Sequence, residues 1–332
     1  MLLDDKTILI TGGTGSFGKC FTKYVMEHSH PKKVIIYSRD EFKQWMMANE
    51  LKEYEDRLRF FIGDVRDLER LRRAFDGVDY VIHAAALKQV PACEYNPNVA
   101  IKTNIHGAMN VIEAALDSGV KKVVALSTDK AVNPVNLYGG TKLVSDKLFV
   151  AANAYVGNKD ISFSIVRYGN VAGSRGSIIP LFHSLIERGE TELPITDLRM
   201  TRFWISLEQG VELVIKALEE AKGGETFISK IPSFKITDLA EAMLPGCKIR
   251  EIGIRPGEKL HEIMVTTEDS FTTYEYEKHF IVYPQMTWNN KQQPDESGRK
   301  VEEGFSYSSG NNSEWLSVED IRRRLGGLHL EK

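Results

Sequence analysis

The chain has 332 residues and a formal net charge of −3, with 42% hydrophobic and 27% charged residues, the composition of a globular protein. This charge balance gives no electrostatic basis for partnership with nucleic acid or a membrane surface, and no run approaches the ~18 apolar residues of a membrane span. The length predicts one large domain with an added lobe, or two domains.

The three cysteines, Cys20, Cys93 and Cys247, show no Cys-x-x-Cys spacing. An odd number without that spacing favours a reducing compartment over a disulfide framework or a zinc site. The chain begins without the basic start and longer apolar run of a secretory leader, so we expect a cytoplasmic protein. No cluster of His, Asp and Glu has metal-ligand spacing, and no metal is expected.

Short apolar runs alternate with amphipathic stretches through the first half of the chain. The apolar runs predict strands at 7–11, 33–37, 58–62, 80–83, 122–126 and 163–167. The amphipathic stretches predict helices at 17–28, 40–54, 105–118 and 136–154. Continuous apolar strands alternating with helices are typical of a parallel sheet covered on both faces. The pattern therefore predicts an α/β fold with a doubly wound (Rossmann) sheet, whose ligands bind beyond the carboxyl ends of the strands.

After Gly169 the loops become longer and richer in Gly, Pro and Arg. A helix is expected over 207–221, followed by a strand over 225–229 that returns to the main sheet. The polar stretch 289–304 is expected to be an irregular surface segment, and the spacing Ser317-x-x-Asp320 predicts the cap of a last helix.

These patterns predict two parts in the chain. The first is a dinucleotide-binding domain over 1–170, which 204–230 rejoins. The second is a smaller substrate-binding lobe with a C-terminal tail, built from 171–203 and 231–332.

Three glycines, Gly12, Gly15 and Gly18, follow the first strand and open the first helix. One allows a tight turn, another lets the backbone approach a pyrophosphate, and the third allows close helix–strand packing. The helix N-terminus then stabilises the phosphate charge. A glycine turn that merely joins strand to helix is the alternative, but the position after a first apolar strand favours a dinucleotide site. The residues between the glycines complete the loop: Thr14, Ser16 and Phe17.

Ser38 and Arg39 end the second strand, where an NAD site usually places an acidic residue on the ribose hydroxyls. A Ser–Arg pair instead suits a 2′-phosphate, because the guanidinium offers a fork of donors. Lys43 lies one helical turn further and can join it. A solvated Arg39 beside Asp40 stays open as the alternative, but the pattern favours NADP over NAD.

Further cofactor contacts are expected at the ends of the third and fourth strands. Asp64, next to Val65, is placed to accept from the adenine amino group or to cap the following helix. The small Ala84 and Ala85 either let the dinucleotide backbone pass or pack against a helix.

Tyr138 and Lys142 are spaced to lie on one face of the helix over 136–154. Lys142 can lower the pKa of the tyrosine by its charge and bind the nicotinamide ribose. A tyrosinate can then take a hydroxyl proton as hydride leaves for the nicotinamide, and Thr128 can hydrogen-bond the same oxygen. A tyrosine that only packs on its neighbour is the alternative.

These motifs carry a family resemblance. Thr11-Gly-Gly-Thr-Gly-Ser-Phe-Gly18 and Tyr138-x-x-x-Lys142 resemble the extended short-chain dehydrogenase/reductases. Over nearly the whole chain the sequence is more similar to the inverting UDP-N-acetylglucosamine 4,6-dehydratases of the pseudaminic acid pathway. The matching segments are Tyr37-Ser-Arg-Asp-Glu41, Phe61-Ile-Gly-Asp-Val-Arg-Asp67, His83-Ala-Ala-Ala-Leu-Lys88, Ser127-Thr-Asp-Lys130, Arg167-Tyr-Gly-Asn-Val171, Met200-Thr-Arg-Phe-Trp204 and Ile254-Arg-Pro-Gly-Glu-Lys-Leu-His-Glu262.

The resemblance implies a reaction with an internal redox cycle. Tyr138 deprotonates the sugar 4-hydroxyl while NADP⁺ takes the C4 hydride. Lys130 abstracts the acidified C5 proton, and Asp129 gives a proton to the departing 6-hydroxyl. Hydride then returns to C6, C5 is reprotonated from the opposite face, and the tightly bound cofactor is recycled. Retaining dehydratases have Asp-Glu in place of Asp129-Lys130, which is why inversion is expected.

Both acid–base roles need shifted pKa values. The pKa of Lys130 must be low enough for a neutral amine, which burial and nearby Lys142 would favour. The pKa of Asp129 must be high enough for a protonated acid, which an apolar pocket would favour. The alternative is a surface turn with an ordinary ion pair.

By resemblance, the second half of the chain binds UDP-N-acetylglucosamine. Three loops are expected to converge on the diphosphate through Arg175, Arg202 and Arg255, and Glu258 is expected to accept from ribose hydroxyls.

Other substrate contacts are expected nearer the sugar and the base. Asn170 follows the sixth strand and can hydrogen-bond a phosphate or the sugar. Lys88 follows the fourth strand and can reach the substrate or the nicotinamide ribose. Thr196 and Met200 are candidates for the uridine pocket.

Other functions stay open at this point. A nucleotide-sugar epimerase, a retaining 4,6-dehydratase or a simple dehydrogenase would keep Tyr138 and Lys142. A non-enzymatic NADP sensor belongs to a different class and generally lacks that pair. The resemblance also implies a homo-oligomer, a dimer or hexamer, in which the helices over 105–118 and 136–154 form a four-helix contact.

Overall fold

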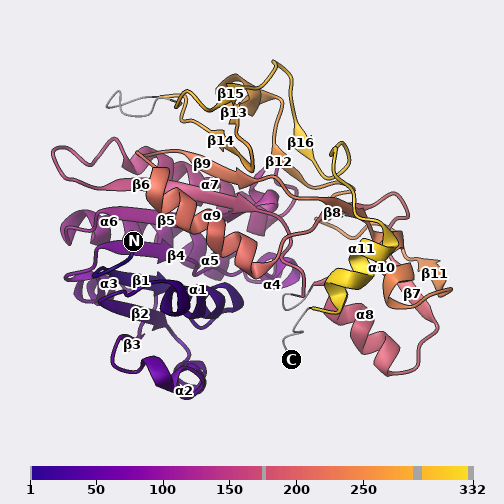
Figure 1. The fold of residues 1–332 in the computed structure, drawn as a ribbon, viewed down its shortest axis with the longest axis horizontal. Helices are drawn as coiled ribbons and strands as arrows, with labels where there is room; N and C mark the ends of the chain where they lie inside the picture. Colours follow the sequence, from indigo (N-terminus) through magenta and orange to yellow (C-terminus); the bar gives the residue numbers. More distant parts are fainter. Residues whose placement is uncertain (1, 174–176, 287–293, 328–332) are drawn as a thin grey trace.

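The computed structural model describes residues 2–173, 177–286 and 294–327, and it is built around one ten-stranded sheet (Figure 1). The parallel part of this sheet runs in the order β3 (Leu58–Ile62), β2 (Lys33–Ser38), β1 (Thr7–Thr11), β4 (Tyr80–His83), β5 (Lys122–Thr128), β6 (Ser162–Tyr168) and β9 (Thr226–Ser229). The chain moves outward from β1 to β3 and then outward from β4 on the other side. The predicted doubly wound sheet is therefore confirmed, including the return of β9 beside β6.

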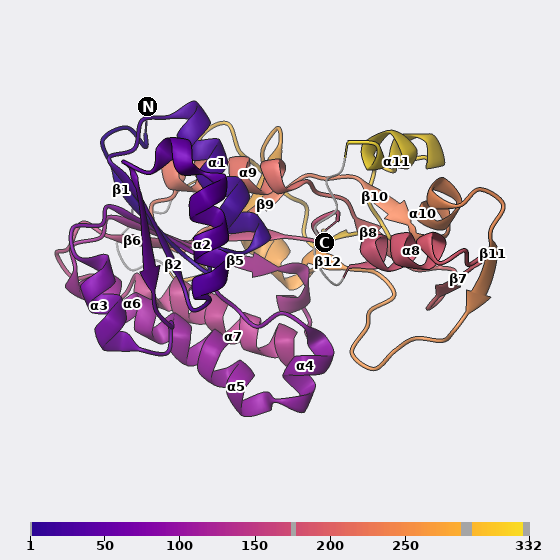
Figure 2. The ribbon, with the colours of Figure 1, turned by 90° about the horizontal axis from the view of Figure 1, so that it is seen from below.

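Helices cover both faces of the sheet (Figure 2). One face carries α1 (Ser16–His28), α2 (Glu41–Glu50) and α9 (Leu207–Glu220). The other carries α3 (Leu68–Phe75), α4 (Val90–Tyr95), α5 (Pro97–Ile101), α6 (Gly107–Asp117) and α7 (Leu137–Ala152). Alternate side chains of β1 serve the two faces: Ile8 and Ile10 pack in the core with Phe21, whereas Leu9 packs in the core with Val111. A strand buried on both faces must be apolar at every position, which is the pattern seen in the sequence.

Two helices differ from their predicted bounds. The helix expected over 40–54 ends at Glu50, because the backbone of Leu51 leaves the helical region, and a separate 3₁₀ turn, η1, spans Lys52–Tyr54. The helix expected over 105–118 starts only at Gly107, after a π-helical turn, η2 (Lys102–His106). In that wide turn the Asn104 amide bonds the backbone of Leu87 as donor and acceptor, at 2.9 and 2.8 Å. Wide turns of this kind often mark functional regions.

A smaller lobe lies beside the carboxyl edge of the sheet (Figure 1). Its elements are α8 (Ile178–Glu187), β7 (Glu192–Ile195), β8 (Thr201–Phe203), β10 (Ser233–Lys235), α10 (Ile236–Met243), β11 (Lys248–Glu251) and α11 (Val318–Leu325). They share a core around Phe182, Trp204 and Leu239. The predicted cap of the last helix is confirmed, because Ser317 and Asp320 form a capping box.

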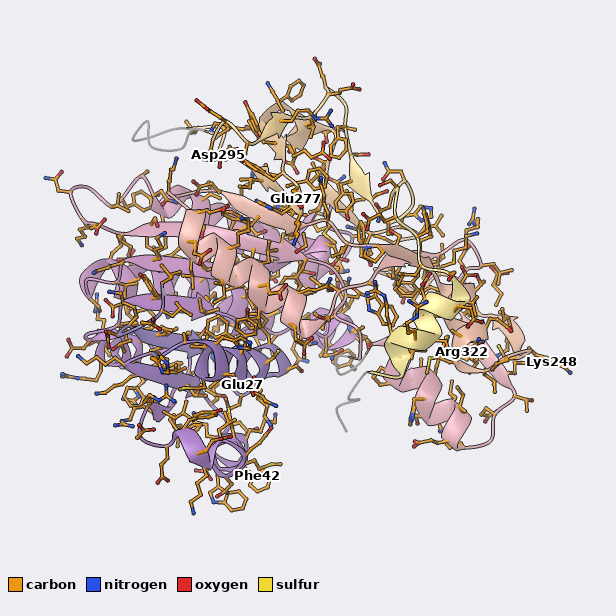
Figure 3. All side chains as sticks on the ribbon, viewed as in Figure 1. Glu27, Phe42, Lys248, Glu277, Asp295 and Arg322 are labelled. Carbon is orange, nitrogen blue, oxygen red and sulfur yellow. The ribbon has the colours of Figure 1, made fainter. Side chains whose placement is uncertain are left out.

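Polar surface surrounds both parts of the molecule. Charged side chains project outward from the sheet side, as Glu27 does on α1, and from the lobe, as Lys248 does on β11 (Figure 3). The antiparallel pair β12 (Ile263–Val265) and β16 (Tyr307–Ser308) lies between the two parts and carries the chain back toward the site.

The segment 273–300 differs from the predicted division of the chain, which assigns it to the lobe. Its strands β13 (Thr273–Glu275), β14 (His279–Val282) and β15 (Arg299–Lys300) extend the main sheet beyond β9 in antiparallel fashion. Strand β14 covers the edge that β9 would otherwise leave open. Part of the irregular segment expected over 289–304 lies outside the described residues, and its described part contains β15.

Candidate active site

A cavity of about 510 Å³ lies beyond the carboxyl ends of the parallel strands. All the residues predicted to hold the cofactor line it: Gly12, Thr14, Gly15, Ser16, Phe17, Gly18, Ser38, Arg39, Lys43, Asp64, Val65, Ala84, Ala85, Lys88, Tyr138 and Lys142. The predicted catalytic residues Thr128 and Lys130 and the predicted substrate residue Asn170 line the same cavity. The topology therefore brings these candidates together, while their individual roles stay predictions.

The glycine loop leaves no room for side chains. Gly12 has a φ of +66°, and a Cβ on it would meet the Ala85 backbone at 2.9 Å. A Cβ on Gly18 would lie 2.3 Å from the carbonyl oxygen of Gly13. No side chain caps the N-terminus of α1 at Gly15, and its first turn carries no acidic residue. The loop thus fits a ligand whose phosphates approach the backbone amides.

The far end of the cavity is basic. The Ser38 hydroxyl hydrogen-bonds that of Thr14 at 2.8 Å, which directs both toward the glycine loop. The Arg39 side chain is half exposed. The Lys43 ammonium lies 3.1 Å from the Asp40 carboxylate. Arg39 and Lys43 both line the cavity, and each lies beside a carboxylate: Arg39 is 3.6 Å from Asp64 and Lys43 is beside Asp40.

Asp64 has an intramolecular partner. The Arg66 guanidinium forms three hydrogen bonds of 2.6–3.0 Å with its carboxylate, and Arg39 lies 3.6 Å away. Partial burial raises the pKa of Asp64, but Arg66 outweighs it and holds that pKa below its usual range. The expected bond to an adenine amino group would therefore have to compete with Arg66.

The catalytic candidates meet where β5 ends. Thr128 is the last residue of β5, and Asp129 and Lys130 form a 3₁₀ turn, η3 (Asp129–Ala131). Tyr138 and Lys142 follow on α7, whose N-terminal turn packs tightly on η3. The closest point is Gly139, where a Cβ would lie 2.1 Å from the Lys130 carbonyl oxygen. Glycine at this position lets the tyrosine helix and the acid–base turn touch.

The Lys130 ammonium is held by three acceptors. It donates to Asn170 Oδ1 at 2.7 Å, to Asp129 Oδ1 at 3.0 Å and to Glu262 Oε1 at 3.2 Å. Asp129 is fully buried; its Oδ1 also accepts from the Thr128 hydroxyl at 2.8 Å, and its Oδ2 has no hydrogen-bond partner among the described residues. Asp129 is thus buried and Lys130 is half-buried at the cavity wall, so the pair is not an exposed surface turn.

The pKa expected for Lys130 is wrong for the protein without ligands. Burial alone would lower the pKa of Lys130, but the negative charges of Asp129 and Glu262 outweigh burial and raise it. The pKa of Asp129 is raised as expected, by burial first and by the charge of Glu262 second. A carboxyl group ready to hold a proton therefore lies 3.0 Å from an ammonium group that is also stabilised.

Tyr138 is also less acidic than the sequence suggests. Burial raises the pKa of Tyr138 to about 12, although the charge of Lys130 and the hydroxyl of Thr128 act in the opposite direction. Burial lowers the pKa of Lys142, which Asp146 partly offsets from the next helical turn. Asp146 in turn accepts from the Ser127 hydroxyl at 2.5 Å. The phenol therefore needs a further positive charge beside it before it can act as a base.

The remaining substrate candidates that the structure describes do not line this cavity. Arg202 is buried; its Nε lies 3.4 Å from Glu262 Oε1, and its NH1 donates to the carbonyl of Thr201 at 2.7 Å. Met200 is buried in the core of the lobe. Arg255 is exposed, and its backbone amide donates to Glu258 at 3.4 Å.

Two candidates need separate mention. Thr196 is buried after β7, and Arg175 lies outside the described residues. None of the described residues in this group lines the cavity. The expected convergence on a diphosphate therefore stays a prediction.

Three charged residues, of which two are buried and Lys259 is half-buried, have no role in the sequence-based prediction. Glu262 and Lys259 both lie in the segment quoted for the family resemblance, which was a signal for them, and Asp146 follows Lys142 by one helical turn. The Lys259 ammonium donates to the backbone carbonyls of Asp129 and Val132, which fixes the η3 turn.

Comparison with known proteins fits this geometry. A family model described as "Polysaccharide biosynthesis protein" matches residues 8–284. The chain belongs to the polysaccharide biosynthesis protein family. It is 58% identical to a UDP-N-acetylglucosamine 4,6-dehydratase (inverting) from Campylobacter jejuni, over 96% of this chain and 97% of that one. It is also 43% identical to a UDP-glucose 4-epimerase from Rickettsia canadensis, over 97% and 95% of the two chains.

Solved structures agree with this family assignment. Pen from Bacillus thuringiensis matches with a TM-score of 0.90 and 39% identity, covering 100% of both chains. DesIV from Streptomyces venezuelae, a dTDP-glucose 4,6-dehydratase solved with NAD and TYD bound, matches at 24% identity with a TM-score of 0.68 over 76% and 86% of the chains, which shows a shared fold. The resemblance to the inverting dehydratases is thereby confirmed. The chain shares the fold of DesIV, and its glycine loop has the tight geometry of a dinucleotide-binding turn.

Two further properties concern the described ranges 2–173, 177–286 and 294–327. None of their helices has the length and apolar character needed to cross a membrane. No group of three or more His, Cys, Asp or Glu side chains within them could hold a metal ion.

Proposed function

We propose that this chain converts UDP-N-acetylglucosamine to a UDP-4-keto-6-deoxy-N-acetylhexosamine with inversion at C5, with NADP bound through each turnover. The observation that supports it best is the Asp129–Lys130 pair, in which buried Asp129 contacts half-buried Lys130 at the cavity wall next to Tyr138. Oxidation at C4 needs Tyr138 and Lys142, whereas loss of water also needs a base for C5 and an acid for the 6-hydroxyl.

The first step uses the tyrosine. Tyr138 takes the proton of the sugar 4-hydroxyl, with Thr128 close enough to hold the same oxygen. A bound nicotinamide would accept the C4 hydride in its oxidised form, which also places a positive charge beside the phenol, and would return that hydride to C6 in its reduced form. That charge acts against the burial that raises the pKa of Tyr138 to about 12.

The elimination uses the acid–base pair. Lys130 begins as a neutral amine and Asp129 as a protonated acid. The amine takes the C5 proton, the C5–H electrons form the C5–C6 double bond, the C6–O bond breaks, and the hydroxyl leaves with the Asp129 proton as water. The pair ends as ammonium and carboxylate, which are 3.0 Å apart in the structure.

The pKa of Lys130 is raised, whereas the elimination needs a neutral amine. Counting the protons of the pair removes this apparent conflict. The pair holds one proton on Asp129 before elimination and one extra proton on Lys130 after it. Resetting the pair is therefore an internal transfer across 3.0 Å and needs no net loss of a proton to water. The raised pKa of Asp129 favours the form with the proton on the carboxyl group, whereas the raised pKa of Lys130 favours the form with the proton on the amine.

NADP is the proposed cofactor because of the basic end of the cavity. Ser38, Arg39 and Lys43 line it where a 2′-phosphate would lie. Arg39→Ala should weaken NADP⁺ binding by about tenfold to a hundredfold, the effect of losing one charge-assisted contact. Its effect on NAD⁺ should stay within about threefold, and equal losses for both, measured by fluorescence titration, would argue for NAD.

A UDP-sugar 4-epimerase is the second candidate, favoured by the similarity to the Rickettsia proteins. It would use Tyr138 and Lys142 and leave the mass of the substrate unchanged. The acid–base pair would then have no chemical task, which is why dehydration is preferred.

The deciding experiment is product analysis in deuterated water. Purified protein with NADP⁺ and UDP-N-acetylglucosamine should give a product lighter by one water, with deuterium at C5 and the inverted configuration by proton NMR. A product of unchanged mass would support the epimerase, and retention at C5 would contradict the proposed stereochemistry.

A homo-oligomer is also proposed. Met109 on α6 and Val144 on α7 are exposed apolar side chains on the two helices that the resemblance places in a four-helix contact. Sedimentation should give a dimer or hexamer, and Met109→Glu together with Val144→Glu should shift it toward the monomer.

A further inference from the structure

Glu262 is a buried anion at the junction between the lobe and the acid–base turn. It immediately precedes β12, and its backbone is fixed from both sides by Ser309: the amide donates to Ser309 Oγ at 2.9 Å, and the carbonyl accepts from the Ser309 amide at 2.8 Å. Its side chain is 4% exposed, and Oε1 lies 3.2 Å from Lys130 Nζ and 3.4 Å from Arg202 Nε. Such a carboxylate cannot move away without breaking several contacts.

The charges around Glu262 differ from those around Asp129. Glu262 faces Lys130 from η3, Arg202 from β8 and Lys259 from its own loop. Burial raises the pKa of Glu262, but these three cations outweigh it, so the carboxyl stays ionised. Asp129 shares the Lys130 cation but is fully buried and lies near the negative charge of Glu262.

We propose that Glu262 is a positioning residue for the dehydration: a fixed anion that orients the Lys130 amine and stabilises the ammonium that forms when this amine takes the C5 proton. This inference rests on the proposed function. It gives Glu262 a role that the proposed reaction steps do not include. Glu262 acts through Lys130 and lies behind it, because it does not line the cavity whereas Lys130 does.

The geometry explains both parts of this role. Lys130 bonds Asn170, Asp129 and Glu262, and when the amine is neutral it has only two N–H groups for these three acceptors. Bonds to Asn170 and Glu262 leave the lone pair free to point elsewhere. When the amine takes the C5 proton, the Glu262 carboxylate stabilises the new positive charge.

The charge of Glu262 has a defined sign in the pH profile. The active form of the Asp129–Lys130 pair holds one proton between the two groups. Adding a second proton causes the loss of activity on the acidic limb, and removing the one proton causes the loss on the basic limb. A negative charge nearby raises both apparent pKa values. Neutralising it should therefore move both limbs toward lower pH, by about one to three pH units for charges in direct contact.

The experiment compares the pH profile of kcat for dehydration, at saturating UDP-N-acetylglucosamine, in the NADP-loaded wild type and in Glu262→Gln. Glu262→Gln should shift both limbs down and lower kcat at the wild-type optimum by about tenfold to a hundredfold. KM and the single-turnover rate of C4 oxidation, read from cofactor absorbance, should stay within about threefold. Limbs that keep their wild-type positions would overturn the proposal.

Two further variants separate charge from folding. Glu262→Asp keeps the charge but withdraws it, so its limbs should lie between those of the wild type and Glu262→Gln; limbs at or below those of the glutamine variant would contradict the role. Glu225→Gln is the matched control, because Glu225 is a buried glutamate that accepts only from backbone amides at 2.7–2.9 Å before β9. An equal shift in that variant would show a general effect of losing a buried charge and would overturn the inference. A wild type that releases no water would refute the proposed function itself, which is a distinct result.

Discussion

Replacing Lys130 by methionine tests whether oxidation and elimination are separate tasks. Methionine keeps the length of the side chain but removes the amine and its charge. Tyr138, Lys142 and Thr128 stay in place, because they come from α7 and β5 and not from the Lys130 side chain. We expect C4 oxidation to continue while the loss of water stops.

The structure sets the size of each effect. Loss of a positioned general base costs about 10²- to 10⁴-fold in rate. For stability, the change removes the cation that bonds Asp129 at 3.0 Å and Glu262 at 3.2 Å. Breaking a buried ion pair by removing one partner costs about 3–5 kcal/mol. We expect the lower end, about 3 kcal/mol, because Arg202 still neutralises Glu262 and Asp129 can take up a proton.

The assay follows the cofactor and the product separately. With Lys130→Met, UDP-N-acetylglucosamine should reduce the bound cofactor, which absorbs near 340 nm in its reduced form, in at most one equivalent per subunit. Mass spectrometry should show no product that has lost water. Thermal unfolding should show that the protein is folded at the assay temperature.

Two outcomes would refute the reasoning. Dehydration at more than about a tenth of the wild-type rate would mean that Lys130 is not the base for C5. A folded variant that has lost both cofactor reduction and dehydration would mean that oxidation and elimination depend on the same group. Tyr138→Phe is the matched control, since it should abolish both cofactor reduction and dehydration.

Two further predictions concern the neighbours of this pair. Gly139→Ala should lower the rate of dehydration more than a hundredfold, because its Cβ would lie 2.1 Å from the Lys130 carbonyl oxygen. In the control Gly140→Ala, the new Cβ meets nothing within 4 Å, so this variant should stabilise the helix by about 1 kcal/mol. Similar activities and melting temperatures for the two variants would contradict the packing. Asp129→Asn should abolish dehydration, and its Tm relative to that of the wild type should rise as the pH increases above the ordinary carboxyl pKa of 3.8. The sign follows because a raised pKa means that the folded protein binds this proton more tightly than the unfolded chain does. The stability of the wild type therefore falls as the pH rises above the ordinary value of 3.8. A Tm difference between variant and wild type that shrinks with pH would show that the pKa of Asp129 is not raised.

The parallel core of the fold is readable from sequence because its signals are local. Each strand of that core is a continuous apolar run, and alternate residues such as Ile8 and Leu9 enter different cores. The antiparallel extension by β13–β15 has no such signal, since it depends on pairing between β14 and β9, far apart in the chain. The π-helical turn at Lys102–His106 could not be predicted from the sequence either, because it depends on the hydrogen bonds between Asn104 and the backbone of Leu87.

The site divides in the same way. The glycine loop and the ends of β2 to β4 carry their candidate cofactor residues in sequence order, so the positions of these candidates in the cavity lining could be predicted, whereas lining residues such as Tyr168 and Leu207 were not. The environment of Lys130 could not, because Glu262 lies 132 residues further along the chain. Burial predicts a lowered pKa for Lys130, and the two carboxylates reverse that sign. Arg202 was predicted to bind a diphosphate from its motif alone, whereas its Nε in the structure lies 3.4 Å from Glu262.

The same distances link the elimination chemistry to the position of the lobe. Lys130 belongs to the sheet through η3, whereas two of the charges that set its environment, Glu262 and Arg202, belong to the lobe and its connection. Lys259, from the same connection, holds the carbonyls of Asp129 and Val132. Any shift of the lobe relative to the sheet must therefore change the bonds that orient the amine. The helix α7, which carries Tyr138 and Lys142, is tied to the same connection at its N-cap, where Asn136 Nδ2 donates to the Gly257 carbonyl at 2.8 Å. A nucleotide sugar that binds to the lobe would thus act on the elimination step through the charges around Lys130, and on the oxidation step through the cap of α7.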